Sequence, residues 1–95
     1  MRTHFIISNN IIELDRQLYG TNHAIVLSNA LGSVVTSNSI ISRDGDRTQA
    51  AAIILTPSTE KCLVTSNNTN VRWSDITGPV QDSGLNNLVD NNISY

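Results

Sequence analysis

Four copies of one short pattern constrain the fold of this chain more than any other feature. In each copy an apolar residue precedes an asparagine by three positions, and an apolar residue or a threonine follows it by two. The four asparagines are Asn9, Asn38, Asn67 and Asn91, which are separated by 29, 29 and 24 residues. A period of about 20–50 residues is typical of a solenoid, whose units bury their apolar faces only by stacking on one another.

A second repeat runs in phase with the first. The apolar run Ala24–Ser28 returns 28 residues later as Ala52–Thr56. Both runs are short and rich in β-branched residues, which favours strands over helices. Alternation along a strand then predicts that Ile25 and Leu27 point into the coil and that Val26 points out of it.

These repeats predict coils of three short strands each. The expected strands cover residues 24–28, 33–37 and 39–42 in the best-defined coil, 51–56, 62–66 and 68–72 in the next, 5–8 in a first coil and 87–90 in a last one. One more strand should lie near 77–81, where Gly78 and Pro79 leave its position undefined. We therefore expect one β-helical module over residues 1–95, with about three coils and an incomplete coil at each end.

The composition agrees with a solenoid and excludes several classes of protein. Asparagine, serine and threonine make up 32 of the 95 residues, and such short polar side chains suit stacked turns. The net charge is −2 and no basic patch exists, so nucleic acid is not an expected partner. No apolar run is long enough to cross a membrane or to form the core of a signal peptide, and we expect no membrane partner.

Cysteine and histidine give no sign of a metal or redox centre. The single cysteine, Cys62, lies in an expected strand beside Leu63 and Val64, which indicates a small packed side chain rather than a nucleophile. His4 and His23 lack the spacing of metal ligands. We therefore expect no metal and no cofactor.

An asparagine at each tight corner has two physical roles. It tolerates the positive φ that a sharp bend between strands requires. At the spacing of about 4.8 Å between stacked strands, each carboxamide can also donate to one neighbour and accept from the other. The sequence therefore predicts a buried asparagine ladder, which satisfies its own polar groups. Its expected members are Asn9, Asn38, Asn67 and Asn91.

This pattern resembles the right-handed parallel β-helix of the pectate-lyase-like superfamily, over roughly residues 5–94. That superfamily has three parallel sheets and an asparagine ladder, and it includes polysaccharide lyases, polysaccharide hydrolases and bacteriophage tailspikes. The chain looks most like a piece of a tailspike. The resemblance concerns the fold alone, because the paired aspartate signatures of the polygalacturonases are not matched here.

The charged stretch Arg43–Arg47 is the first candidate site. In the resembling superfamily, substrate grooves are built from loops of this kind and the neighbouring sheet. Asp44 and Asp46 are candidate catalytic residues, as the acid and base of a polysaccharide hydrolase or lyase. A solvated turn is the alternative interpretation, because Asp-Gly pairs are common in turns.

Other residues are candidates for binding a sugar. Glu13 and Asp15 occupy the equivalent position one coil earlier, beside cationic side chains. A mixed charged strip suits a charged polysaccharide, but it also suits surface ion pairs that contribute little to stability. The ring of Trp73 could pack on a sugar face or anchor its loop on the coil. The expected substrate-binding residues are Glu13, Asp15, Arg43, Arg47 and Trp73.

Val26 and Ile54 should point outward from adjacent coils, which suggests contact with a neighbouring subunit in a homotrimer. The leading hypothesis is a β-helical module of a phage tailspike or a related polysaccharide-processing protein, in a virion tail or outside the cell. It would contribute structure and part of a carbohydrate-binding surface. The alternatives are a purely structural trimerisation or stacking unit with no sugar chemistry, and a small β-sandwich whose periodicity is accidental. The expected protein partners are the other subunits of a homotrimer or the rest of a longer β-helix.

Overall fold

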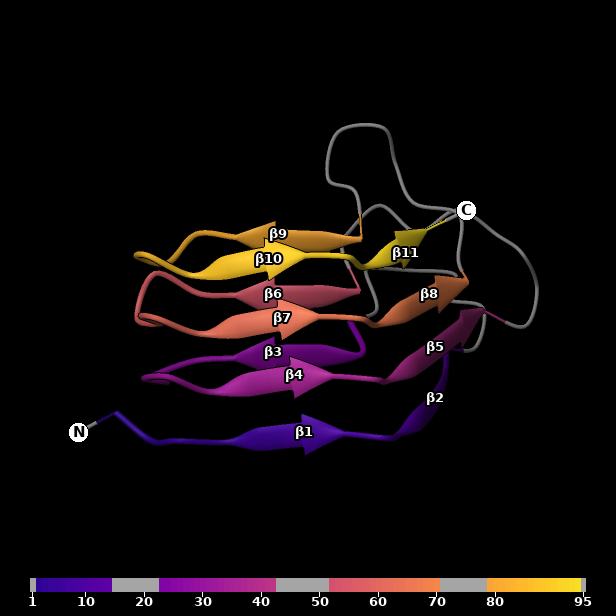
Figure 1. Cartoon of the computed structure of the whole chain (residues 1–95), viewed down its shortest axis with the longest axis horizontal. Coiled ribbons are helices and arrows are strands. Elements are labelled where there is room, and N and C mark those ends of the chain that lie inside the picture. Colours follow the sequence, from indigo (N-terminus) through magenta and orange to yellow (C-terminus); the bar gives the residue numbers. More distant parts are fainter. Residues whose placement is uncertain (1, 15–22, 43–51, 71–78, 95) are drawn as a thin grey trace.

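The chain winds into a coil of short parallel strands. The computed structural model describes residues 2–14, 23–42, 52–70 and 79–94, and these residues contain eleven strands and no helix (Figure 1). The strands are β1 (Ile6–Ser8), β2 (Ile11–Leu14), β3 (Ile25–Leu27), β4 (Val34–Thr36), β5 (Ser39–Ser42), β6 (Ile53–Leu55), β7 (Leu63–Thr65), β8 (Asn68–Asn70), β9 (Val80–Asp82), β10 (Leu88–Asp90) and β11 (Ile93–Ser94). Every pairing between them is parallel, and strands that follow each other in the chain do not pair.

Three parallel sheets form the faces of the coil. The first sheet contains β1, β4, β7 and β10, the second contains β2, β5, β8 and β11, and the third contains β3, β6 and β9. The chain visits the sheets in turn and rises by one strand at each visit, in the right-handed sense that Figure 1 shows. The prediction of an all-β parallel β-helix of about three coils is confirmed.

The core is a stack of inward-facing side chains from successive coils. Val35 pairs in register with Ile7 on one side and with Val64 on the other, and Val64 pairs with Val89. Ile25 and Leu27 are buried as predicted, whereas Val26 between them is 53% exposed. The buried apolar residues are Ile25, Leu27, Ala30, Val35, Ile40, Ala52, Ile53, Leu55, Cys62 and Val64.

Each strand that was predicted with definite bounds contains an observed strand, and most observed strands are shorter by one or two residues at an end that the structure describes. The strand that the sequence left undefined is β9, which begins directly after Pro79. Pro79 lacks an amide hydrogen but still contributes its carbonyl, which accepts from the amides of Ala52 at 2.9 Å and Ile53 at 3.1 Å. A proline just before an outermost strand therefore costs no hydrogen bond between coils.

The asparagine ladder is present, but its two outer members differ from the prediction. The Nδ2 of Asn10 donates to the Oδ1 of Asn38 at 2.9 Å, and Asn38 donates in the same way to Asn67 at 2.9 Å. Asn67 in turn donates to Asn92 at 2.8 Å. The ladder therefore contains Asn10, Asn38, Asn67 and Asn92. The predicted outer members, Asn9 and Asn91, do not belong to it.

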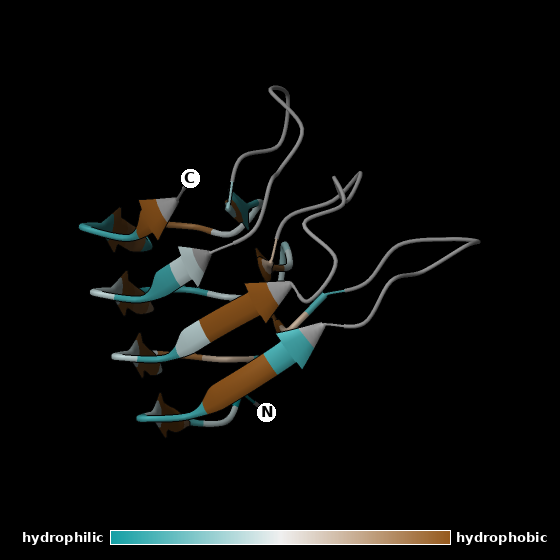
Figure 2. Cartoon of the chain, turned by 90° about the vertical axis from the view of Figure 1, so that its right-hand side faces the viewer, coloured by the Kyte–Doolittle hydropathy of each residue, from teal (hydrophilic) through white to brown (hydrophobic). Residues whose placement is uncertain are grey.

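Asn9 and Asn91 have a different role in the same corner. Their φ angles are 59° and 54°, and the equivalent residues of the two inner coils, Ser37 and Ser66, have φ angles of 59° and 60°. The residue with positive φ is thus the one that precedes the ladder, and the prediction combined two functions in one position. Both outer corners have two consecutive asparagines, and the prediction chose the first of each pair. This choice shifts the predicted strand positions by one residue, which exchanges the inward and outward side chains. Figure 2 shows how closely the corners of successive coils stack.

A second column of residues with positive φ lies at the corner where the chain passes from the third sheet to the first. It consists of Gly32, Lys61 and Asn86, with φ angles of 64°, 54° and 54°. Each of these is followed by an inward residue, and in one coil that residue is Cys62, which is 1% exposed. Its Sγ lies 3.7 Å from the carbonyl oxygen of Ala30. The interpretation of Cys62 as a packed side chain is confirmed.

Candidate functional site

The chain passes from the second sheet to the third at one edge of the coil. Connections join β2 to β3, β5 to β6 and β8 to β9. The strands that they leave are stacked, since Leu14 pairs with Ser42 and Ile41 pairs with Asn70. The strands that they enter are stacked as well, since β6 pairs with both β3 and β9. We call this the loop edge, defined by the ends of β2, β5 and β8 and the starts of β3, β6 and β9.

All of the residues proposed for carbohydrate chemistry belong to or adjoin this edge in the sequence. Glu13 is part of β2, pairs in register with Ile41, and has an exposed side chain. The remaining candidates are Asp15, Arg43, Asp44, Asp46, Arg47 and Trp73, which lie outside the described residues. Their catalytic and binding roles therefore stay predictions, while the strands from which their connections depart are fixed.

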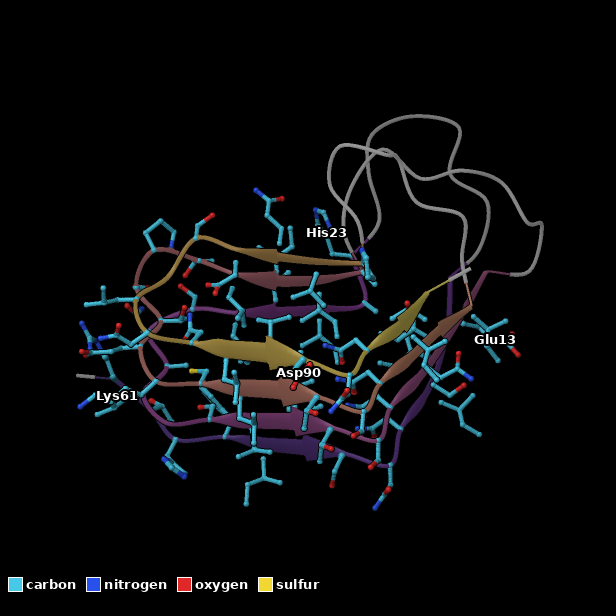
Figure 3. All side chains as sticks on the ribbon, turned by 45° about the horizontal axis from the view of Figure 1, so that its top comes forward. Glu13, His23, Lys61 and Asp90 are labelled. Atoms are coloured by element: carbon cyan, nitrogen blue, oxygen red, sulfur yellow. The ribbon has the colours of Figure 1, made fainter. Side chains whose placement is uncertain are left out.

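His23 is a further residue at the loop edge. It directly precedes Ala24 and β3, and its side chain is half-buried. Figure 3 shows Glu13 and His23 on the side of the coil where the second and third sheets are joined, whereas Lys61 lies at the opposite corner. The sequence pattern tested His23 only as a metal ligand, and its place at this edge was not predicted. The signal that was available is its place just before the repeated strand 24–28.

Other polar clusters in the described residues serve the turns of the coil. The hydroxyl of Ser58 lies 2.9 Å from that of Thr56 and accepts from the amide of Asn29 at 2.8 Å. Near the amino terminus, Arg2 forms an ion pair with Glu60. The bond from Asn29 to Ser58 joins corners of neighbouring coils, and the ion pair between Arg2 and Glu60 also joins corners of different coils, so these polar groups stabilise the stacking of the coils. The described residues contain no group of three or more histidine, cysteine or acidic side chains that could hold a metal ion.

Outward apolar side chains form a stripe along the first sheet. It contains one aliphatic residue per coil, namely Ile6, Val34, Leu63 and Leu88, which pair in register. Ile6 is 73% exposed and Leu88 is 58% exposed. The pair predicted as a contact face, Val26 and Ile54, also stacks, but the column on the third sheet continues with Gln81. The more continuous apolar column is therefore on the first sheet, whereas the predicted contact face is on the third.

A shallow depression lies at the carboxyl-terminal end of the coil. It has a volume of about 290 Å³ and is lined by Pro79, Val80, Val89, Asp90, Asn91 and Asn92. It therefore opens on the last coil of the stack and adjoins the loop edge at Val80, the first residue of β9. Among the described residues, no helix is long and apolar enough to cross a membrane.

Comparison with known proteins gives no match. No family model, curated protein or solved structure is significantly similar to this chain. The functional argument therefore depends on the geometry of the coil and on the residues of its loop edge.

Proposed function

We propose that this chain is a β-helical module of a larger polysaccharide-binding assembly, of the kind found in bacteriophage tailspikes. In this proposal the stacked coils supply the scaffold and the loop edge supplies part of a carbohydrate-binding surface, in a virion tail or outside the cell. The observation that supports the proposal is the stacking, at one edge of successive coils, of the strands that three connections leave and enter.

The repeat of the edge suits a polymer as the ligand. Successive coils are separated by about 4.8 Å, so the strand ends from which the three connections depart recur at regular intervals. A polysaccharide also presents equivalent groups at regular intervals, and it can contact several coils at once. Side chains on loops that a rigid scaffold positions are common binding elements.

The residue types along this edge fit sugars. Carboxylates and guanidinium groups make charge-assisted hydrogen bonds with hydroxyl and carboxylate groups of a polysaccharide. An indole ring offers an apolar face with a polar tip, which suits the face of a sugar ring. The described Glu13 contributes an exposed carboxylate at the start of this strip.

A purely structural stacking unit is the second candidate function. The described polar side chains at the corners form hydrogen bonds within the asparagine ladder and the turns. Within the described residues, the outermost strands at the two ends of the coil each pair on one side only. A unit of this kind would bind and cleave no polysaccharide. The two candidates therefore differ in a property that a binding assay measures directly.

The experiment compares polysaccharide binding by the wild-type chain and by variants of the loop edge, on immobilised neutral and acidic polysaccharides. We expect Glu13→Gln and Trp73→Ala each to weaken binding by about tenfold, the effect of losing one good contact. Asp90→Asn is the matched control, because Asp90 is an exposed carboxylate on β10 of the first sheet, which contributes no strand end to the loop edge (Figure 3). Absence of binding to every polysaccharide would favour the structural unit, whereas equal losses in all three variants would show that binding does not depend on the loop edge.

Catalysis is tested separately from binding. If Asp44 and Asp46 act as acid and base, Asp44→Asn and Asp46→Asn remove the release of sugar fragments but preserve binding. Cleavage at the wild-type rate in both variants would show that these residues are not the catalytic pair.

A further inference from the structure

The two ends of the coil expose complementary parts of one hydrogen-bonding pattern. In the first sheet, the amide of Val34 donates to the carbonyl of Phe5 at 2.9 Å. The amides of Leu63 and Leu88 donate to the carbonyls of Ser33 and Cys62 in the same way, each at 2.8 Å. The amide at this position of each strand thus points to the preceding coil, and the carbonyl one residue earlier points to the following coil.

This direction of the hydrogen bonds leaves backbone amides without a described partner at the amino-terminal end of the coil, and backbone carbonyls without one at the carboxyl-terminal end. At the amino-terminal end, the amide of Ile6 points away from β4, and at the carboxyl-terminal end the carbonyl of Asn87 points away from β7. The second sheet repeats this arrangement with the amide of Ile11 and the carbonyl of Asn92. Within the described part of the chain, no residue pairs with these four groups.

The asparagine ladder has the same polarity. The Nδ2 of Asn38 donates backwards to the carbonyl of Ile7 at 3.1 Å and forwards to the Oδ1 of Asn67 at 2.9 Å. The Nδ2 of Asn92 makes the backward bond, to the carbonyl of Val64 at 3.0 Å, and no described acceptor lies ahead of it. At the other end, the Oδ1 of Asn10 receives no bond from a described donor. The ladder therefore ends in a donor at one end and in an acceptor at the other.

The backbones and side chains of the two end strands also match. Asn9 and Asn91 occupy the same corner position with φ angles of 59° and 54°. The inward position holds Ile7 in β1 and Val89 in β10, and Val89 lines the depression at the carboxyl-terminal end. A first coil placed on a last coil would thus repeat the packing that already joins successive coils.

We propose that a second copy of this chain stacks head to tail, with its first coil on the last coil of its neighbour. The amides of Ile6 and Ile11 of one copy then donate to the carbonyls of Asn87 and Asn92 of the other, and Asn92 donates to Asn10. The contact joins the first and second sheets and leaves one strand position open beyond β9 on the three-stranded third sheet. Because each copy keeps a free donor end and a free acceptor end, the contact repeats and produces open stacks. This inference does not depend on carbohydrate binding.

The test uses a proline that blocks stacking but spares the coil. In Ile6→Pro the lost amide is one that no described residue uses, whereas Ile6→Ala keeps the amide and serves as the control. Light scattering after size exclusion, over a range of concentrations, should show a wild-type mass that rises beyond that of a dimer. Ile6→Pro should weaken this association by about a hundredfold, because a proline removes a ladder bond in the middle of a sheet. Ile6→Ala should retain the concentration dependence.

Mixing separates head-to-tail stacking from lateral assembly. A copy with Ile6→Pro still has its acceptor end, so it can terminate a wild-type stack, and an equimolar mixture should contain short stacks only. If circular dichroism shows that Ile6→Pro is unfolded, Asn92→Asp takes its place. That variant still accepts from Asn67, loses the donor to the carbonyl of Val64, and presents a carboxylate to the Oδ1 of Asn10, so its association should be weakened in the same way.

Three results would overturn the proposal. The first is a wild-type chain that is monomeric at every concentration, which would assign the ends to another part of a longer β-helix. The second is a trimer or dimer of fixed mass. The third is association that a folded Ile6→Pro or Asn92→Asp variant leaves unchanged.

Discussion

The ladder residue Asn67 should be one of the positions most sensitive to substitution in the described chain. Its side chain is fully buried. Its Oδ1 accepts from the backbone amide of Asn38 at 3.0 Å and from the Nδ2 of Asn38 at 2.9 Å. Its Nδ2 donates to the carbonyl of Val35 at 3.1 Å and to the Oδ1 of Asn92 at 2.8 Å. Its Nδ2 also donates to the carbonyl of Thr65 at 3.2 Å, so Asn67→Ala removes five bonds at once.

The cost of Asn67→Ala follows from the groups that lose their partners. Asn38 is 1% exposed, so its two donors would have no water to replace the lost acceptor. A buried polar group without a partner costs about 1–3 kcal/mol, and two such groups cost about 4 kcal/mol in total. A small domain has a free energy of unfolding of roughly 5–15 kcal/mol, so the variant should be close to unfolding.

The assay is urea denaturation followed by far-ultraviolet circular dichroism, which gives the free energy of unfolding and its urea dependence. The matched control is Asn68→Ala, because Asn68 is the next residue, is exposed, and should change the stability by no more than about 0.5 kcal/mol. Equal destabilisation by the two substitutions, or a loss below about 1 kcal/mol for Asn67→Ala, would refute the reasoning from buried hydrogen bonds.

Two further predictions concern the third-to-first-sheet corner. Gly84→Ala should destabilise the chain by about 1–3 kcal/mol in the same assay, because a Cβ there would lie 2.1 Å from the Oγ1 of Thr59 and 2.6 Å from its carbonyl oxygen. A wild-type urea midpoint for that variant would mean that the corner is loosely packed. The thiol of Cys62 should react with iodoacetamide about a hundredfold more slowly in buffer than in urea, since it is buried and reacts only when the coil opens. Equal rates would contradict its place in the core.

The fold could be predicted because the sequence contains two independent periodic signals, one between coils and one within strands. The spacing of the asparagines gives the length of a coil, and alternation within strands such as Ile25–Leu27 gives the inward face. These two signals reinforce each other in the inner coils, where Asn38 and Asn67 were placed correctly. In parallel sheets the partners are identical positions of successive coils, so one period determines every pairing.

The outer coils show where sequence reasoning failed. At Asn9–Asn10 and Asn91–Asn92 two neighbouring asparagines fit the motif, and the repeat alone does not distinguish them. The apolar alternation could have done so. Placing Asn10 in the ladder turns Ile12 inward, in register with the buried Ile40, and leaves Ile11 exposed. The same error of one residue hid the outward stripe of the first sheet, because the predicted motif makes Ile6 and Leu88 equivalent to Val35, which is buried.

The candidate site is less predictable than the fold. Sequence order places the charged residues after stacked strands, which is enough to assign Glu13 to the loop edge. Recognition of a sugar depends on the relative positions of side chains from three connections, and the coil repeat does not determine those positions. Loop conformation is set by local turns and contacts that have no period.

The most direct test of the account is a nuclear magnetic resonance measurement of contacts between the asparagine side chains. The account predicts nuclear Overhauser effects that link the side-chain amides of Asn10, Asn38, Asn67 and Asn92 in that order, with slow hydrogen exchange at Asn38 and Asn67. The side-chain amides of Asn9 and Asn91 should exchange rapidly. Close contacts between α-hydrogens of paired strands, which indicate antiparallel sheets, would instead support a β-sandwich and contradict the parallel coil.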